Sequence, residues 1–218
     1  SLASLQSAVE ELHRRCSRLD VLIHNAGVVY PQRRTTADGW EAQLAVIYLS
    51  PFWLTQQVEG LLLGGHEARV VNVVSDLHRG GCLNFDDFHM QRGYHFLSSY
   101  RRAELAKILW TYQLARRWQG TAVSANCVHP GGVRSQLFRH FRGPLGWLIW
   151  LSGWLKQSPQ SGARGSLQLA LSPSLKGVSG QYFVGTRRGQ SSAVSRDERL
   201  AERLWSHSQD VIAATAPS

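Results

Sequence analysis

Two turns of small residues follow apolar runs in this sequence, and both are suited to contact with a nucleotide. His24-Asn25-Ala26-Gly27 directly follows the run Leu19–Ile23, and His129-Pro130-Gly131-Gly132-Val133 directly follows the run Ala122–Val128. A flexible turn at the carboxyl end of a strand lets the backbone approach a ligand closely. Proline and glycine also fix a tight bend in the second turn. Either turn alone is compatible with an ordinary connection between a strand and a loop.

A serine and a tyrosine supply hydroxyl groups in the same context. Ser75 ends the apolar run Arg69–Val74, and Tyr100 stands at the start of a long helical pattern. Taken singly, such hydroxyls are usually structural. Their order in the chain, between the two turns of small residues, favours a functional pair.

The elements that position these residues alternate between β-branched runs and amphipathic segments. The runs predict strands over Leu19–Ile23, Arg69–Val74, Ala122–Val128 and Gly180–Val184. Near-continuous apolar runs are typical of strands covered on both faces, as in a parallel sheet. The other segments predict helices over Leu2–Arg15, Trp40–Leu63, Tyr100–Trp118, Ser161–Ala170 and Arg196–Ala213. This alternation indicates an α/β fold with βαβ units in one domain, residues 1–218, whose motifs gather at the carboxyl edge of the sheet.

Together these motifs resemble those of the short-chain dehydrogenase/reductase family, in particular its retinol dehydrogenase branch. Asn25-Ala26-Gly27 is similar to the end of the family's Asn-Asn-Ala-Gly motif, and Ser75 and Tyr100 have the spacing of its catalytic pair. The resemblance implies a Rossmann-like doubly wound sheet. It implies that Tyr100 is the general acid/base and that Ser75 polarises the substrate oxygen. It also implies that NADP(H) is held by Asn25, Ala26, Gly27, Tyr100, Pro130, Gly131 and Val133, with Ser135 nearby.

Other segments extend the resemblance over nearly the whole chain: Thr36–Glu41, Leu114–Arg117, Gln157–Ala163 and Arg203–Trp205. The family's glycine-rich turn, which holds the cofactor pyrophosphate, has no match in this sequence. Ser1–Ser4 resembles the stretch after the family's third strand. We therefore expect an N-terminally truncated chain whose sheet lacks the first βα units and whose NADPH binding is weak.

Two catalytic positions of the family carry different residues here. Glu104 stands one helical turn after Tyr100, where the family has a lysine, and its negative charge would disfavour the tyrosinate. Ile47 occupies the place of an asparagine that supports a proton-relay water. Lys107 lies two turns beyond Tyr100, and we expect it to be too far along the helix to replace the lysine. These changes predict very low activity.

Composition narrows the classes of protein further. The 218 residues carry a net charge of +9, and no Asp or Glu lies between Glu104 and Asp197. Such a basic stretch suits a phosphorylated cofactor or a membrane surface, or is a solvated face, whereas no nucleic-acid motif accompanies it. The three cysteines form no metal-ligand or disulfide pattern. We therefore expect no metal, no secretion, and a cytoplasmic or cytosol-facing location, with the endoplasmic reticulum membrane as one option.

The most apolar segment is Leu145–Leu155, which Arg142 and Lys156 flank. It is too short to span a bilayer, but its tryptophans suit a membrane interface. The resemblance places it at the substrate entrance. Membrane contact and a lid helix packed on the core both remain open.

Two functions follow as hypotheses. The first is an oxidoreductase that moves hydride between NADP(H) and a lipophilic, retinoid-like alcohol or aldehyde. The second is a catalytically impaired relative that acts as a binding or scaffold protein or is a truncated product, which Glu104 and Ile47 favour.

Overall fold

A single sheet forms the centre of the molecule. The computed structural model describes residues 1–144 and 157–215. The strands, in spatial order, are β1 (Val21–His24), β2 (Arg69–Val73), β3 (Ser124–His129), β4 (Tyr182–Val184) and β5 (Arg187–Gly189). β1 to β4 run parallel, as the sequence predicted, and β5 returns antiparallel to β4. The sequence did not predict β5, because this strand is short and exposed and has no apolar pattern.

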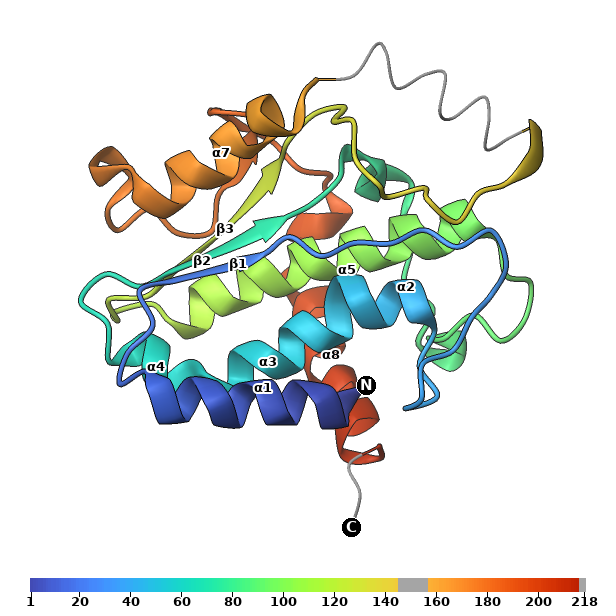
Figure 1. Cartoon of the computed structure of the whole chain (residues 1–218), viewed down its shortest axis with the longest axis horizontal. Helices are drawn as coiled ribbons and strands as arrows, with labels where there is room; N and C mark the ends of the chain where they lie inside the picture. The colour runs from blue at the N-terminus through green and yellow to red at the C-terminus, as the bar shows by residue number, and fades with distance from the viewer. Residues whose placement is uncertain (145–156, 216–218) are drawn as a thin grey trace.

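The helices cover the two faces of the sheet unequally (Figure 1). Among the described helices longer than one turn, α7 (Pro159–Leu171) covers one face. The other face is covered by α1 (Leu2–Arg15), α3 (Ser50–Gln57), α4 (Glu59–Leu63), α5 (Phe96–Arg117) and α8 (Glu198–Ala213). Helices on both faces of a parallel sheet make the doubly wound α/β architecture that the sequence predicted.

The helix predicted over Trp40–Leu63 is broken into several pieces. It begins as α2 (Ala42–Leu44), widens into the π-helical turn η1 (Ala45–Leu49), and continues as α3 and α4. The Glu41 carboxylate caps the start, because it accepts hydrogen bonds from the N–H groups of Gln43 and Leu44, both at 2.9 Å. Pro51 at the start of α3 has no N–H to donate, which is compatible with the irregular turn before it.

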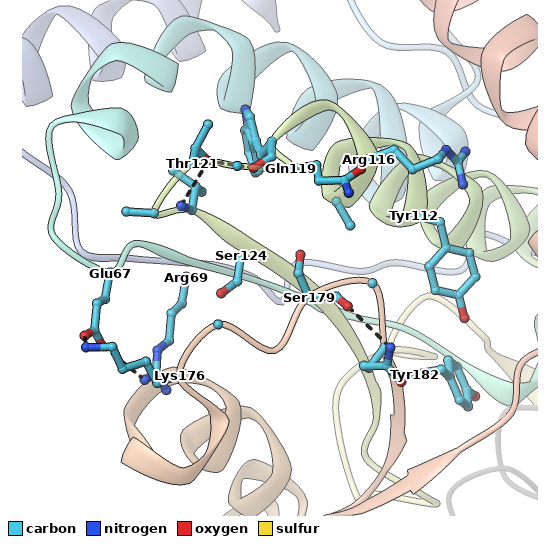
Figure 2. A pocket seen from close by; sticks show the side chains of 18 of the residues that line it. Glu67, Arg69, Tyr112, Arg116, Gln119, Thr121, Ser124, Lys176, Ser179 and Tyr182 are labelled. Atoms are coloured by element: carbon cyan, nitrogen blue, oxygen red, sulfur yellow. Dashed lines mark hydrogen bonds and ion pairs between the residues drawn. The ribbon is translucent and has the colours of Figure 1, made fainter.

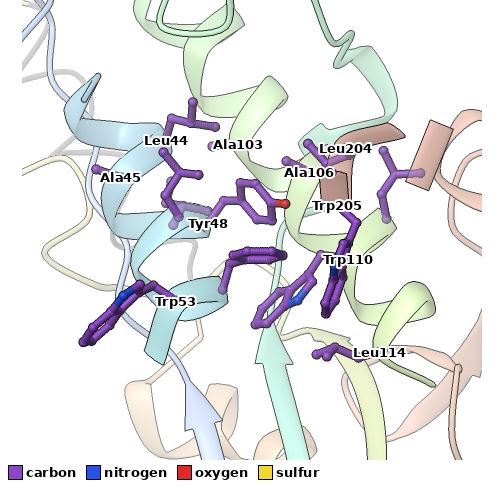
Figure 3. Packing of buried hydrophobic residues seen from close by; sticks show 14 of the residues in the cluster. Leu44, Ala45, Tyr48, Trp53, Ala103, Ala106, Trp110, Leu114, Leu204 and Trp205 are labelled. Atoms are coloured by element: carbon purple, nitrogen blue, oxygen red, sulfur yellow. The ribbon is translucent and has the colours of Figure 1, made fainter. Parts of the chain in front are cut away.

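Large aromatic residues join α3, α5 and α8 (Figure 3). The Trp110 ring of α5 lies 6.1 Å from the rings of Tyr48 and Phe52, and Phe52 lies 4.9 Å from Trp205 of α8. These tilted and edge-on contacts add specific geometry to apolar burial. The hydroxyl of Tyr48 also forms a 2.7 Å hydrogen bond with Ser208. The helix that carries Tyr100 is therefore held firmly along its length.

In the described part of the chain, no helix is long and apolar enough to cross a bilayer. The segment Leu145–Leu155, for which membrane contact was one expectation, lies outside the described residues.

Candidate active site

The predicted motifs gather at the carboxyl edge of the sheet. β1 leads into Asn25-Ala26-Gly27 and β3 into Pro130–Val133, while β2, which lies between them, leads to Ser75. Asn25 and Ala26 are exposed, so their backbone is open to a ligand. The gathering expected from the sequence is confirmed, and the roles of the residues stay predictions.

The turn after β3 is held by Gln157, which comes from just before α7. The backbone N–H of Gln157 donates to the Gly132 carbonyl at 2.8 Å, and the N–H of Arg134 donates to the Gln157 carbonyl at 3.0 Å. Gly131 has a φ of +84°, and a Cβ there would collide with the Gln157 side chain. Only glycine fits this position without strain.

The segments that follow the two turns lie side by side. The N–H of Val29 donates to the Leu137 carbonyl at 3.2 Å, so the segment after the Pro-Gly turn reaches the segment after β1. A Cβ on Gly27 would lie 3.4 Å from the Leu137 side chain, which shows how close the two segments come. Small residues and exposed backbone are what a planar amide ring needs at this edge.

Ser75 is fixed through all of its polar groups. Its N–H donates to Oε2 of Glu104 at 2.8 Å, and its Oγ accepts a 3.3 Å hydrogen bond from the N–H of Leu77. Its carbonyl accepts from Nδ1 of His78 at 2.8 Å. The hydroxyl is therefore presented in a defined direction.

His78 is a supporting residue that the sequence reasoning missed. It is fully buried, and its Nε2 accepts a 3.0 Å hydrogen bond from the N–H of Ser192. Because Nδ1 donates and Nε2 accepts, the ring is the neutral tautomer. Burial is the main cause that lowers the pKa of His78. No sequence pattern marks this residue, because its partner Ser192 lies far along the chain.

Tyr100 lies on the second turn of α5 and is only 5% exposed. The side chains of Ser75 and Glu104 both lie beside its hydroxyl. Burial, and then the charge of Glu104, raise the pKa of Tyr100 well above its ordinary value, while the hydrogen bond from Ser75 lowers it. Ser75 and Tyr100 are thus brought together, and the tyrosine is protonated at neutral pH.

The two positions that depart from the family pattern, Glu104 and Ile47, are both buried. Glu104 is 5% exposed and Ile47 is 1% exposed, in the π-helical turn. Lys107 is fully buried and donates to the His24 carbonyl at 2.8 Å, so its amine does not take the place of the missing lysine at the tyrosine hydroxyl. The spacing of Glu104 and Lys107 is the one at which helical side chains meet, and it was the available signal for a charged pair.

Aromatic side chains form an apolar patch one helical turn before Tyr100. The Phe96 ring of α5 lies 5.1 Å from the Phe141 ring, and Phe141 lies 5.7 Å from Phe138. Phe138 and Phe141 belong to the segment that follows the Pro-Gly turn. Phe141 is buried in the main hydrophobic core, and Phe96 and Phe138 pack against that core at the start of α5.

A wide hollow lies at the opposite, amino-terminal edge of the sheet (Figure 2). It measures about 810 Å³ and is lined by residues at or before the starts of β2, β3 and β4, among them Arg69, Ser124 and Gln181. None of the predicted site residues lines it. We place the candidate site at the carboxyl edge, because the polar contacts converge there. Within residues 1–144 and 157–215, no group of His, Cys, Asp or Glu could hold a metal ion.

Known proteins of similar sequence identify the family. The short chain dehydrogenase profile matches residues 1–144. Retinol dehydrogenase 14 of Mus musculus is 40% identical over 215 residues, which cover 97% of this chain and 64% of that protein. Polyprenol dehydrogenase of Homo sapiens is 35% identical over 221 residues, which cover 95% of this chain and 65% of that protein. The chain therefore spans less than two thirds of the length of these relatives.

Solved structures share the fold. An uncharacterized protein from Mycobacterium Paratuberculosis gives a TM-score of 0.74 at 27% identity, over 96% of this chain and 73% of that chain. A short chain dehydrogenase from Shigella flexneri 2a, complexed with NADP, gives a TM-score of 0.58 at 20% identity, over 86% of this chain and 71% of that chain. The chain belongs to the short chain dehydrogenase family and is retinol dehydrogenase-like.

Proposed function

We propose that this protein is an oxidoreductase that exchanges hydride between NADP(H) and a lipophilic alcohol or aldehyde of the retinoid or polyprenol type. The observation that carries the proposal is the pairing of the Ser75 and Tyr100 hydroxyls at the carboxyl end of β2, between the turns after β1 and β3. The relatives named retinol dehydrogenase and polyprenol dehydrogenase support a long apolar alcohol as substrate.

The chain's own residues would bind and orient the reactants. Backbone groups of Asn25, Ala26 and Gly27 on one side, and of Pro130, Gly131 and Val133 on the other, would hold the nicotinamide end. When bound, the cofactor supplies or accepts the hydride. The structure of a family member with NADP supports this class of cofactor.

The Ser75 hydroxyl would hold the substrate oxygen, and Tyr100 would exchange a proton with it. The ring of Phe96, one helical turn before Tyr100, packs with those of Phe138 and Phe141, and apolar side chains in this region support a lipophilic substrate.

A second candidate is a non-catalytic binding protein for the same ligands. The buried carboxylate of Glu104 favours it, because that charge raises the pKa of Tyr100 and so opposes formation of the tyrosinate.

One experiment separates the two candidates. The chain is incubated with retinal and NADPH, or with retinol and NADP, and the retinoids are quantified by chromatography. We expect slow conversion that Tyr100→Phe abolishes. Tyr112→Phe is the matched control, since it removes a hydroxyl from the same helix whose partner is Ser191. Retinoid binding without conversion, equal in both variants, would establish the binding protein instead.

The proposal includes contact of the segment Leu145–Leu155 with an anionic membrane, because tryptophans and flanking cations suit that surface. The protein should sediment with anionic liposomes, and high salt should reduce the sedimented fraction. Equal recovery in the supernatant with and without liposomes would favour a lid helix.

A further inference from the structure

The carboxylate of Glu104 is built into the candidate site rather than turned away from it. It is 5% exposed, Oε2 accepts the 2.8 Å hydrogen bond from the Ser75 N–H, and the Tyr100 hydroxyl lies beside it. The hydrogen bond with Glu104 raises the pKa of Tyr100 and lowers that of the carboxyl, so the tyrosine donates and the carboxylate accepts. The Ser75 side chain has the opposite effect and lowers the pKa of Tyr100, as expected for a hydroxyl that donates to the tyrosine oxygen.

Lys107 supplies the charge that balances this carboxylate. It is fully buried one turn further along α5 and is anchored by its 2.8 Å hydrogen bond to the His24 carbonyl. Burial lowers the pKa of Lys107 to about 8, so the amine is protonated at pH 7. Burial raises the pKa of Glu104, and the charge of Lys107 opposes that rise.

The other titratable groups that face this pair are neutral. Burial, followed by the charge of Lys107, lowers the pKa of the His24 imidazole on β1 to about 3. Burial raises the pKa of the Cys127 thiol on β3 to about 12. Tyr100 is protonated as well, so the electrostatic coupling that remains in the cluster is the one between Glu104 and Lys107.

We propose that Glu104 is the terminal proton acceptor and donor of this site, acting on the substrate oxygen through Tyr100, and that Lys107 is a positioning residue that keeps the carboxylate ionised. The proposal rests on the proposed function. Under this proposal, the glutamate at position 104 has a catalytic function of its own, although the family has a lysine there. If the proton of Tyr100 passes on to Glu104, the reaction does not require a stable tyrosinate.

The proton transfers balance in both directions. In alcohol oxidation, the substrate O–H bond breaks and its proton bonds to the Tyr100 oxygen, while the Tyr100 proton passes to Glu104. The carbinol C–H bond gives up its hydrogen with both electrons to the oxidised nicotinamide dinucleotide, and the alcohol becomes a carbonyl. After the product leaves, the proton returns to solvent through Tyr100. Carbonyl reduction follows the same path in reverse.

This arrangement predicts the sign of the pH dependence. Oxidation needs ionised Glu104, so its rate should rise with pH through the raised pKa of that carboxyl, and reduction should fall over the same range. Loss of the Lys107 charge above about pH 8 removes the group that opposes the rise in the Glu104 pKa.

The decisive test is spectroscopic and needs no turnover. The pKa of Tyr100 and of Glu104 is followed by NMR in protein labelled at the tyrosine Cζ and glutamate Cδ carbons. In Glu104→Gln, the Tyr100 pKa should fall by at least one unit, and in Lys107→Met the Glu104 pKa should rise by at least one unit. Glu202→Gln is the matched control. Glu202 lies on α8 and accepts a hydrogen bond from Gln113, which is near the end of α5 that is far from Tyr100. A Tyr100 pKa that does not respond to Glu104→Gln overturns the proposal.

Kinetics then separate this proposal from the proposed function. Glu104→Gln should lower kcat for alcohol oxidation by about 100-fold or more with little change in KM, in the range of lost general acid–base catalysis. Glu104→Asp should restore part of it and keep the pH profile. If the unmodified protein exchanges hydride and Glu104→Gln does so equally well, the proposed function stands and the Glu104 role falls. If the unmodified protein is inactive while the titrations are coupled, both catalytic roles fall.

Discussion

The two edges of the sheet differ in how deeply their charged side chains are buried. At the amino-terminal edge the hollow is wide, and most of its cations sit near the surface, with Lys176 against Glu67 and Arg116 4.0 Å from Glu198. At the carboxyl edge, Glu104, Lys107 and His24 are buried and joined to each other or to Ser75. Low dielectric makes each of those buried contacts far stronger than a solvated one. Convergent buried polar groups, rather than volume, make the carboxyl edge the candidate active edge.

The largest expected effect tests the burial of His24 at the carboxyl edge. Its pKa falls from 6.5 to about 3 on folding, because burial and then Lys107 disfavour the charged ring. The unfolded chain therefore binds the proton first. The buried neutral ring of His24 therefore makes its full contribution to the free energy of unfolding above about pH 6.5, and this contribution is lost as the pH falls toward 3. At about 1.4 kcal/mol per pKa unit, the loss between pH 7 and pH 4.5 is about 3 kcal/mol.

Urea unfolding at the two pH values measures this loss. His24→Asn keeps a polar side chain near the Thr55 hydroxyl, 2.8 Å from the native ring, and does not titrate. The variant should lose about 2 to 3 kcal/mol less than the native chain between pH 7 and pH 4.5. His66→Asn, at an exposed position, should behave like the native chain. Equal acid sensitivity in all three proteins would show that the ring is solvated and would remove the contrast between the edges.

The next largest expected effect tests Arg69, a cation that is buried at the amino-terminal edge. Arg69 donates to the carbonyls of Leu169 and Ser172, at 3.2 and 2.8 Å, and so completes the end of α7. Arg69→Met leaves both carbonyls without this donor and should lower the free energy of unfolding by about 2 to 3 kcal/mol. Hydride exchange at 25 °C should be unchanged. A loss of exchange with intact folding would mean that the two edges are coupled.

A third test compares two glycines of similar backbone conformation. Gly131 in the Pro-Gly turn has a φ of +84° and Gly39 a φ of +79°, but only a Cβ on Gly131 would meet a neighbour, the Gln157 side chain. Alanine at either site should cost about 1 to 2 kcal/mol of stability through the left-handed backbone. Only Gly131→Ala should also lower hydride exchange, by about tenfold or more, because the turn must shift. Equal exchange in both variants would remove the turn from the site.

The sequence predicted the fold well wherever burial leaves a pattern. The parallel strands and α1 are visible as apolar runs and as an amphipathic period. Ser75 and the two turns follow from their place after strands, and Tyr100 from its place at the start of a long helical pattern. The break at the π-helical turn Ala45–Leu49 was not predicted, because the sequence stays apolar through it and the cap at Glu41 acts locally.

The site was predicted less completely than the fold. His78 supports Ser75 through Ser192, a contact between residues far apart in the chain that no local pattern encodes. From the sequence, Glu104 was interpreted only as a negative charge that disfavours the tyrosinate of Tyr100. Its anchoring by the Ser75 N–H and its pairing in charge with Lys107 depend on how β2 and α5 meet, which one sequence does not specify.

The smallest effect tests the rim of the hollow at the amino-terminal edge. Lys176 is exposed and pairs with Glu67, which also lies 3.9 Å from Arg69. Exposed pairs contribute about 0 to 1 kcal/mol, because solvent screens the charges and both side chains lose freedom. Lys176→Gln should therefore lower the free energy of unfolding by less than about 1 kcal/mol, and the difference should vanish in high salt. Urea unfolding at low and high salt measures it beside Arg69→Met. If Lys176→Gln costs as much as Arg69→Met and salt has no effect, the rim is not solvent-screened. The charges of the amino-terminal edge would then be held as tightly as those around Ser75, and the position of the active edge would have to rest on the motifs alone.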